Sequence, residues 1–112
     1  MQEQLLKDFQ TVYSDLFKAT ESYRNHAIEL AQKQYEVNQL EAQLYADGKI
    51  DGKNKAIRDA QVAELMKAPL QDLHDLEIAE RESSLALELV KLYVEYHRSI
   101  LRIYELSEDK ND

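Results

Sequence analysis

The sequence predicts an all-α protein, a long antiparallel coiled-coil helical hairpin with a short intervening helix. Its 112 residues include only two Gly and one Pro, too few for the turns of a sheet protein. An apolar residue recurs every seven positions in the first half, and a continuous polar line with spacings of three and four follows the second half. We expect one helical domain over residues 1–112.

The first helix is expected over about residues 3–46, a stretch without Gly or Pro. Six apolar residues define its seven-residue repeat: Phe9, Leu16, Tyr23, Leu30, Val37 and Leu44. A strict seven-residue repeat indicates a left-handed coiled coil. A weaker companion seam becomes polar toward its end: Leu6, Tyr13, Thr20, Ala27, Gln34 and Glu41.

A turn is expected over residues 47–53, because Gly48 directly after the periodic segment is the usual signal for a helix end. Asn54 is a good N-cap for a short helix over 54–67. Pro69 then interrupts the chain, because proline removes a backbone donor and clashes with the preceding helical turn.

The last helix is expected over about residues 69–106, with a frayed tail over 107–112. Its polar positions form one line at spacings of three and four: His74, Glu77, Arg81, Ser84, Glu88, Lys91, Glu95, Arg98, Arg102 and Glu105. That line predicts the solvent face, with exposed ion pairs contributing ~0.3–0.5 kcal/mol each.

Apolar residues of the last helix occupy all the heptad positions outside this polar line. The resulting apolar surface is far larger than one partner helix can cover. We therefore predict an oligomer interface formed by seven residues: Leu85, Leu89, Leu92, Tyr93, Tyr96, Ile100 and Ile103. Two hairpins would assemble into a four-helix bundle dimer, although a larger homo-oligomer is compatible with the pattern. The alternative is that the short helix folds back and covers this apolar surface.

The sequence predicts no enzyme, metal site or cofactor. The segment after Asp47 has Lys49 and Arg58 at the third and twelfth positions of a calcium loop, where oxygen ligands are required. No His is preceded at three residues by Glu, so the di-iron bundle motif is missing, and there is no phosphate loop or nucleophile motif. His97 is expected to be a partly exposed packing residue.

One basic cluster occurs in this acidic chain, at the tip of the hairpin: Lys49, Lys53, Lys55 and Arg58. It is a candidate contact for phosphates or for an acidic partner. The formal net charge of −8 disfavours nucleic acid, and no aromatic residue interleaves the cluster to stack on bases. The alternative is a solvated loop.

The turn and its sequel read Ile50-x-Gly52-Lys53-Asn54-x-x-x-Arg58-x-Ala60 between two long helices. This arrangement resembles small uncharacterised helical proteins carried by phages, prophages and some bacterial genomes. The resemblance implies a coiled-coil fold and a setting near phage recombination or replication genes. It brings no catalytic residues.

These observations favour a non-enzymatic oligomeric adaptor or accessory protein whose partners are itself and another protein. A nucleic-acid-binding protein that uses the basic tip is one alternative, and an acidic inhibitor of a host nuclease is another. The sequence begins without a basic segment followed by an apolar run, and Leu85–Tyr104 contains too many charges for a membrane span. We therefore expect a cytoplasmic protein without membrane contact.

Overall fold

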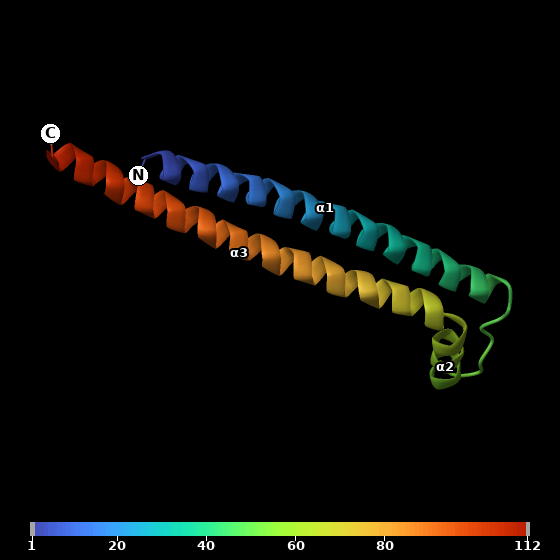
Figure 1. The fold of residues 1–112 in the computed structure, drawn as a ribbon. Coiled ribbons are helices and arrows are strands. Elements are labelled where there is room, and N and C mark those ends of the chain that lie inside the picture. Colours follow the sequence, from blue (N-terminus) through green and yellow to red (C-terminus); the bar gives the residue numbers. More distant parts are fainter. Residues whose placement is uncertain (1, 112) are drawn as a thin grey trace. The chain divides into compact units, whose positions relative to one another are not determined.

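A computed structural model describes residues 2–111, which form three helices and no strand (Figure 1). Helix α1 spans Gln2–Ala46, α2 spans Lys55–Leu65 and α3 spans Lys67–Asn111. The predicted all-α class is confirmed. The bounds follow the predicted ranges closely, except at the two ends of α3.

Helix α1 ends in the way that its Gly predicts. Gly48 has a φ of 73°, a conformation that glycine adopts without steric cost. The backbone N–H of Lys49 donates to the carbonyl of Leu44, and the N–H of Gly48 donates to the carbonyl of Tyr45. This pair of bonds is the Schellman motif, and it satisfies two carbonyl groups that the helix end leaves open.

The far end of α3 differs from the predicted frayed tail, because the helix continues past Leu106 to Asn111. No Gly or Pro follows Pro69, so nothing in the sequence ends the helix. The Tyr104 hydroxyl also donates to Oε1 of Glu108, one turn later, at 2.9 Å. Asp112 lies outside the described residues.

The chain divides into two compact units. Unit 1 combines α1 up to Arg24 with α3 from Arg81 onward. Unit 2 contains the continuous stretch Asn25–Glu80, which includes the end of α1, the turn, α2 and the start of α3.

The core of unit 2 is a small cluster to which all three helices contribute. Val37 of α1, Leu73 of α3 and the intervening Met66 are buried together, and Met66 is fully buried. Leu30, Leu44 and Val62 pack against this cluster. At its edge Lys33 lies 3.7 Å from the carboxylate of Asp72.

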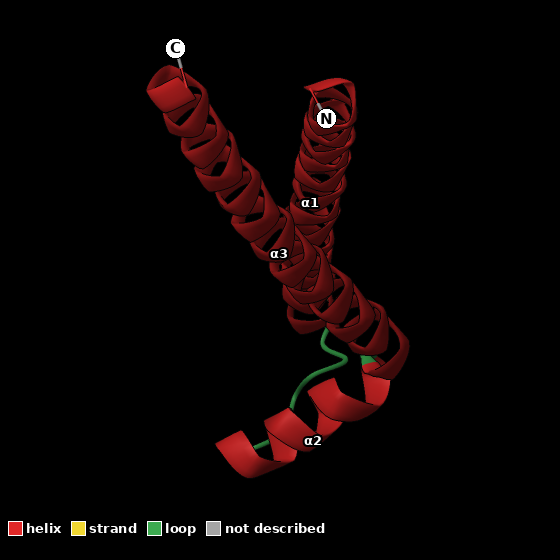
Figure 2. Cartoon of the chain, turned by 60° about the vertical axis from the view of Figure 1, so that its left-hand side comes forward, coloured by secondary structure: helices red, strands yellow, loops and turns green. Residues whose placement is uncertain are grey.

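The predicted break before Pro69 is confirmed, and it lies at Met66. Met66 caps α2 with φ −110° and ψ 17°, which is outside the helical range, and α3 begins at the next residue. Pro69 therefore lies in the first turn of α3, where its missing N–H costs no helical hydrogen bond. Figure 2 shows the resulting sharp change of direction between α2 and the start of α3.

The core of unit 1 is a strip between the two long helices. Val12 of α1 and Leu87 and Val94 of α3 are buried. Phe9 meets the ring of His97 edge-on, with centroids 5.8 Å apart. At the side of this strip the guanidinium of Arg98 donates to the Tyr13 hydroxyl at 3.4 Å.

The two seams of α1 have different outcomes. All six residues of the main predicted seam, from Phe9 to Leu44, are buried or half-buried. In the companion seam Thr20, Ala27 and Glu41 are half-buried, whereas Tyr13 is exposed and the preceding Val12 is buried in its place. Positions three and four residues after a seam residue flank it on opposite sides, so the direction of α3 decides which one is covered.

We expect Met66→Ala to destabilise the protein by about 2–5 kcal/mol, because it leaves a cavity at the junction of three helices. Leu65→Ala removes a similar volume from the neighbouring side chain, which is exposed, and should cost less than about 1 kcal/mol. Urea unfolding followed by circular dichroism measures both changes. Equal destabilisation by the two variants would contradict the assigned core.

Candidate functional site

The turn before α2 is held in place by the side chain of Gln61. Its carboxamide oxygen accepts hydrogen bonds from the backbone N–H groups of Asp51 and Gly52, at 3.1 and 3.0 Å. Its nitrogen donates to Oδ1 of Asp51 at 2.9 Å. A single side chain of α2 thus supplies partners for backbone groups that no helix or sheet satisfies. The sequence offers no periodic signal for this role.

Gly52 allows α2 to approach the turn closely. A Cβ at this position would lie 2.6 Å from Cγ2 of Ile57 and 2.9 Å from the backbone nitrogen of Arg58. Both distances are too short for a real contact, and the second atom is backbone that cannot rotate away. The turn therefore requires glycine here for space, with no special backbone angle involved.

Several residues of the segment from Ile50 to Ala60 support the turn. Asn54 is the N-cap of α2, as predicted, and its Oδ1 accepts a hydrogen bond from the N–H of Ile57 at 2.9 Å. Nη1 of Arg58 donates to the carbonyl of Gly52 at 3.2 Å. Ile50 is buried. These contacts explain the residues by local structure, without any ligand.

The four residues of the basic tip differ in exposure and in hydrogen bonding. The side chains of Lys49, Lys53 and Lys55 are exposed, whereas Arg58 is half-buried and bonded to Gly52. Three aspartates lie in the same segment: Asp47, Asp51 and Asp59. Because they nearly balance the basic charges, the tip is only weakly positive, and this reduces its attraction for phosphates.

The outer face of α3 is apolar and exposed within the chain. Of the seven residues predicted to form an interface, only Ile100 is half-buried. The most exposed are Ile103 at 67%, Leu92 at 62%, and Leu85 and Tyr96 at 60% each. The buried residues Leu87 and Val94 lie on the other side of the same helix. Helix α3 therefore carries two apolar faces, and α1 covers one of them in unit 1.

The short helix α2, the alternative cover for this face, contributes to the core of unit 2. Its residue Val62 packs against the core of unit 2. No residue of α2 is buried, and the outer face of α3 keeps the exposure given above. Leu106, with 57% of its surface exposed, extends this face beyond the predicted set. Its position three residues after Ile103, inside the predicted helix, is the sequence signal that could have added it to that set.

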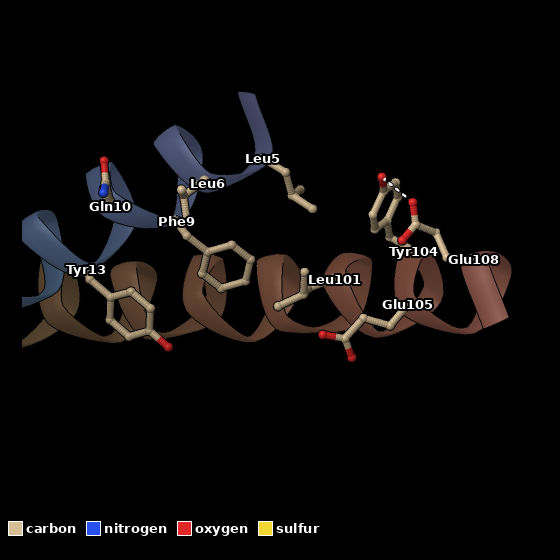
Figure 3. Close-up of a pocket in the computed structure, with 9 residues that line it drawn as sticks. All are labelled: Leu5, Leu6, Phe9, Gln10, Tyr13, Leu101, Tyr104, Glu105 and Glu108. Carbon is tan, nitrogen blue, oxygen red and sulfur yellow. Dashed lines mark hydrogen bonds between the residues drawn. The ribbon is translucent and has the colours of Figure 1, made fainter. Parts of the chain in front are cut away.

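An apolar groove of about 860 Å³ lies between the first turns of α1 and the last turns of α3 (Figure 3). Leu5 and Phe9 line it from α1, and Leu101 and Tyr104 line it from α3. The hydrogen bond to the Glu108 carboxylate raises the pKa of Tyr104, since it stabilises the protonated phenol. The groove has apolar walls, with the carboxylates of Glu105 and Glu108 at one end.

His97 lies in the aromatic cluster of unit 1. Its ring makes edge contacts with Phe9 and with Tyr96, and the latter centroids are 5.6 Å apart. Its Nδ1 atom is buried without a hydrogen-bond partner in the described part of the chain. The ring thus acts as a packing residue, in agreement with the sequence-based expectation, at the cost of one unsatisfied nitrogen.

The described part of the chain contains neither a cluster of metal ligands nor a membrane-spanning helix. Among residues 3–108, whose side chains the structure describes, no three His, Cys, Asp or Glu side chains come together as metal ligands. The helices within residues 2–111 also lack a segment that is both long and apolar enough to cross a membrane.

We expect Gly52→Ala to cost about 1–3 kcal/mol, because the new methyl group collides with Ile57 and with the backbone of α2. Lys53→Ala, at the adjacent exposed position, is the matched control and should change stability by less than about 0.5 kcal/mol. Both values are measured by urea unfolding. A Gly52→Ala protein as stable as the wild type would disprove the close approach.

Two surfaces therefore have properties suited to a partner, the exposed lysines of the tip and the outer face of α3. The lysine surface is small and nearly balanced by acidic neighbours. The α3 surface is larger, apolar and continuous along the helix. Comparison with known proteins finds no family model, curated protein or solved structure that matches this chain.

Proposed function

We propose that this protein is a non-enzymatic coiled-coil adaptor or accessory protein that works as a dimer or larger assembly of itself. The observation that carries the proposal is the exposed apolar face of α3. Soluble monomers rarely expose a contiguous apolar patch of more than a few hundred Å², and larger patches mark interaction sites. A second chain is the ordinary means of removing such a face from water.

In the proposed assembly each chain forms an antiparallel hairpin, and two hairpins form a four-helix bundle. The contacts within each unit support the hairpin. In unit 1 the early residue Phe9 meets the late residue His97. In unit 2 Lys33, near the end of α1, meets Asp72, near the start of α3. A closed bundle with a two-fold axis is the simplest arrangement that covers both faces of α3.

Two observations support the role of adaptor or accessory factor. The described residues include no cluster of metal ligands, and the outer face of α3 exposes a large apolar surface. The phage-type resemblance of the turn suggests recombination or replication of phage DNA as the setting, in the cytoplasm. In that setting the bundle would hold another protein by its side or at its tip. A pull-down from host lysate distinguishes such an adaptor from an acidic inhibitor, which would recover a nuclease.

We expect the double variant Leu92→Glu/Ile103→Glu to dissociate the assembly, because it places charges inside an apolar interface. Static light scattering at micromolar concentration measures the mass. The control is Lys91→Glu/Glu105→Lys, which changes two exposed residues of the polar line and should keep the wild-type mass. A folded wild-type protein with the mass of one 13.1 kDa chain would refute the proposal.

A second candidate function, nucleic-acid binding, is favoured only by the three exposed lysines of the tip. Because the chain is acidic and aspartates surround the tip, we expect no retention on single- or double-stranded DNA at about 150 mM salt. A fluorescence salt titration tests this expectation. Binding by the wild type that is lost in Lys49→Glu/Lys53→Glu/Lys55→Glu would establish the second function instead. Arg58 is left unchanged, because it supports the turn.

A further inference from the structure

The exposed face of α3 has its own seven-residue repeat. Its members follow one another at spacings of four and three residues, and all are exposed: Leu85, Leu89, Leu92, Tyr96, Ser99, Ile103 and Leu106. Only Ser99 among them is polar. This second seam, on the side away from α1, indicates that another helix packs along α3 in coiled-coil fashion.

The residues that flank this seam differ on its two sides. One side is apolar, with Ala86, Tyr93 and Ile100. The other side is charged and exposed, with Arg81, Glu88, Glu95 and Arg102. In a parallel pair of identical helices, each charged flank would lie against the apolar flank of its neighbour. An antiparallel pair brings apolar flanks together on one side and charged flanks together on the other, so the pattern selects the antiparallel orientation.

We propose that α3 pairs with α3 of a second copy of this chain, antiparallel about a two-fold axis near Val94. This inference rests on the proposed self-assembly and defines its geometry. Leu92 packs opposite Tyr96 of the second copy, Leu85 opposite Ile103 and Leu89 opposite Ser99. The two-fold axis makes each of these contacts occur twice. The two helices are therefore in contact from residue 85 to residue 103, along about 27 Å of helix.

Charge fixes the register of this pair. In it Glu88 lies opposite Arg102 of the second copy, and the two-fold axis makes this attraction occur twice. A shift of one heptad in one direction would place Arg81 opposite Arg102 and Glu88 opposite Glu95, two repulsive contacts. The opposite shift would place Glu95 opposite Arg102 and would leave Leu85 without a layer partner, as the chosen register leaves Leu106, so the Glu88 and Glu95 variants below distinguish these two registers. The chosen register also sets the small Ala86 against the larger Ile100.

The register has one unfavourable contact, which is itself informative. Glu95 lies close to the axis, so the two copies bring their Glu95 carboxylates together on the charged side. We therefore expect Glu95→Gln to strengthen the dimer by roughly threefold, since it removes one repulsive contact between exposed groups. In the parallel arrangement these two carboxylates would be separated by the seam, and the substitution would leave the dissociation constant unchanged.

A charge swap tests the register. Glu88→Arg and Arg102→Glu should each weaken the dimer roughly tenfold, because each turns two attractions into repulsions. The double variant Glu88→Arg/Arg102→Glu should return to within about threefold of the wild type. These residues lie about 21 Å apart along one helix, so restoration requires contact between chains. Sedimentation equilibrium gives the dissociation constants, and additive weakening in the double variant would overturn the register.

Cysteine crosslinking tests the orientation without interference, because the natural chain has no Cys. Leu85→Cys/Ile103→Cys should form a disulfide-linked dimer on mild oxidation, whereas either single variant should remain unlinked. Crosslinking of Leu85→Cys alone would indicate parallel helices and overturn this inference. A dimer that none of these variants links would place the interface elsewhere and overturn it as well. Both results leave the proposed self-assembly intact, and only a folded wild-type monomer removes that as well.

Discussion

Helix α3 must bury apolar side chains on two sides, and the rest of the structure depends on this constraint. One side, with Leu87 and Val94, is buried against α1 in unit 1. The other side carries Leu92, Tyr96 and Ile103, which keep most of their surface exposed within a single chain. Burial yields about 25 cal/mol per Å² of apolar surface, so leaving this face in water is unfavourable. The proposed assembly would cover this face with a second copy of the chain.

The turn region connects α1 to α2 with few residues and a well-defined geometry. Gly48 ends α1, Gln61 satisfies the turn backbone, and Met66 ends α2 while filling the core of unit 2. Arg58 and Asn54, which in the sequence look like possible ligand contacts or motif residues, bond to this same turn.

Electrostatics has a secondary role in holding the single chain together. The ion pairs of Lys33 with Glu36 and Asp72 involve exposed carboxylates and have separations of 3.7 to 3.9 Å. Such pairs contribute little to stability in water. The charges of the polar line matter more as a boundary, because they limit the apolar face of α3 on one side. In the proposed dimer this charged boundary selects the orientation of the partner helix, which a uniformly apolar helix could not do.

The sequence by itself determined the helical class, the end of α1 and the main seam from Phe9 to Leu44, because periodicity and helix-end signals are local properties of a chain. It also identified the apolar excess on α3. Tertiary structure decided which neighbouring positions are covered, as with Val12 in place of Tyr13, since this depends on the direction of the facing helix. It likewise decided that Arg58 supports the turn. Contacts between residues distant in sequence, such as Gln61 with Asp51, leave no periodic trace from which they could be predicted.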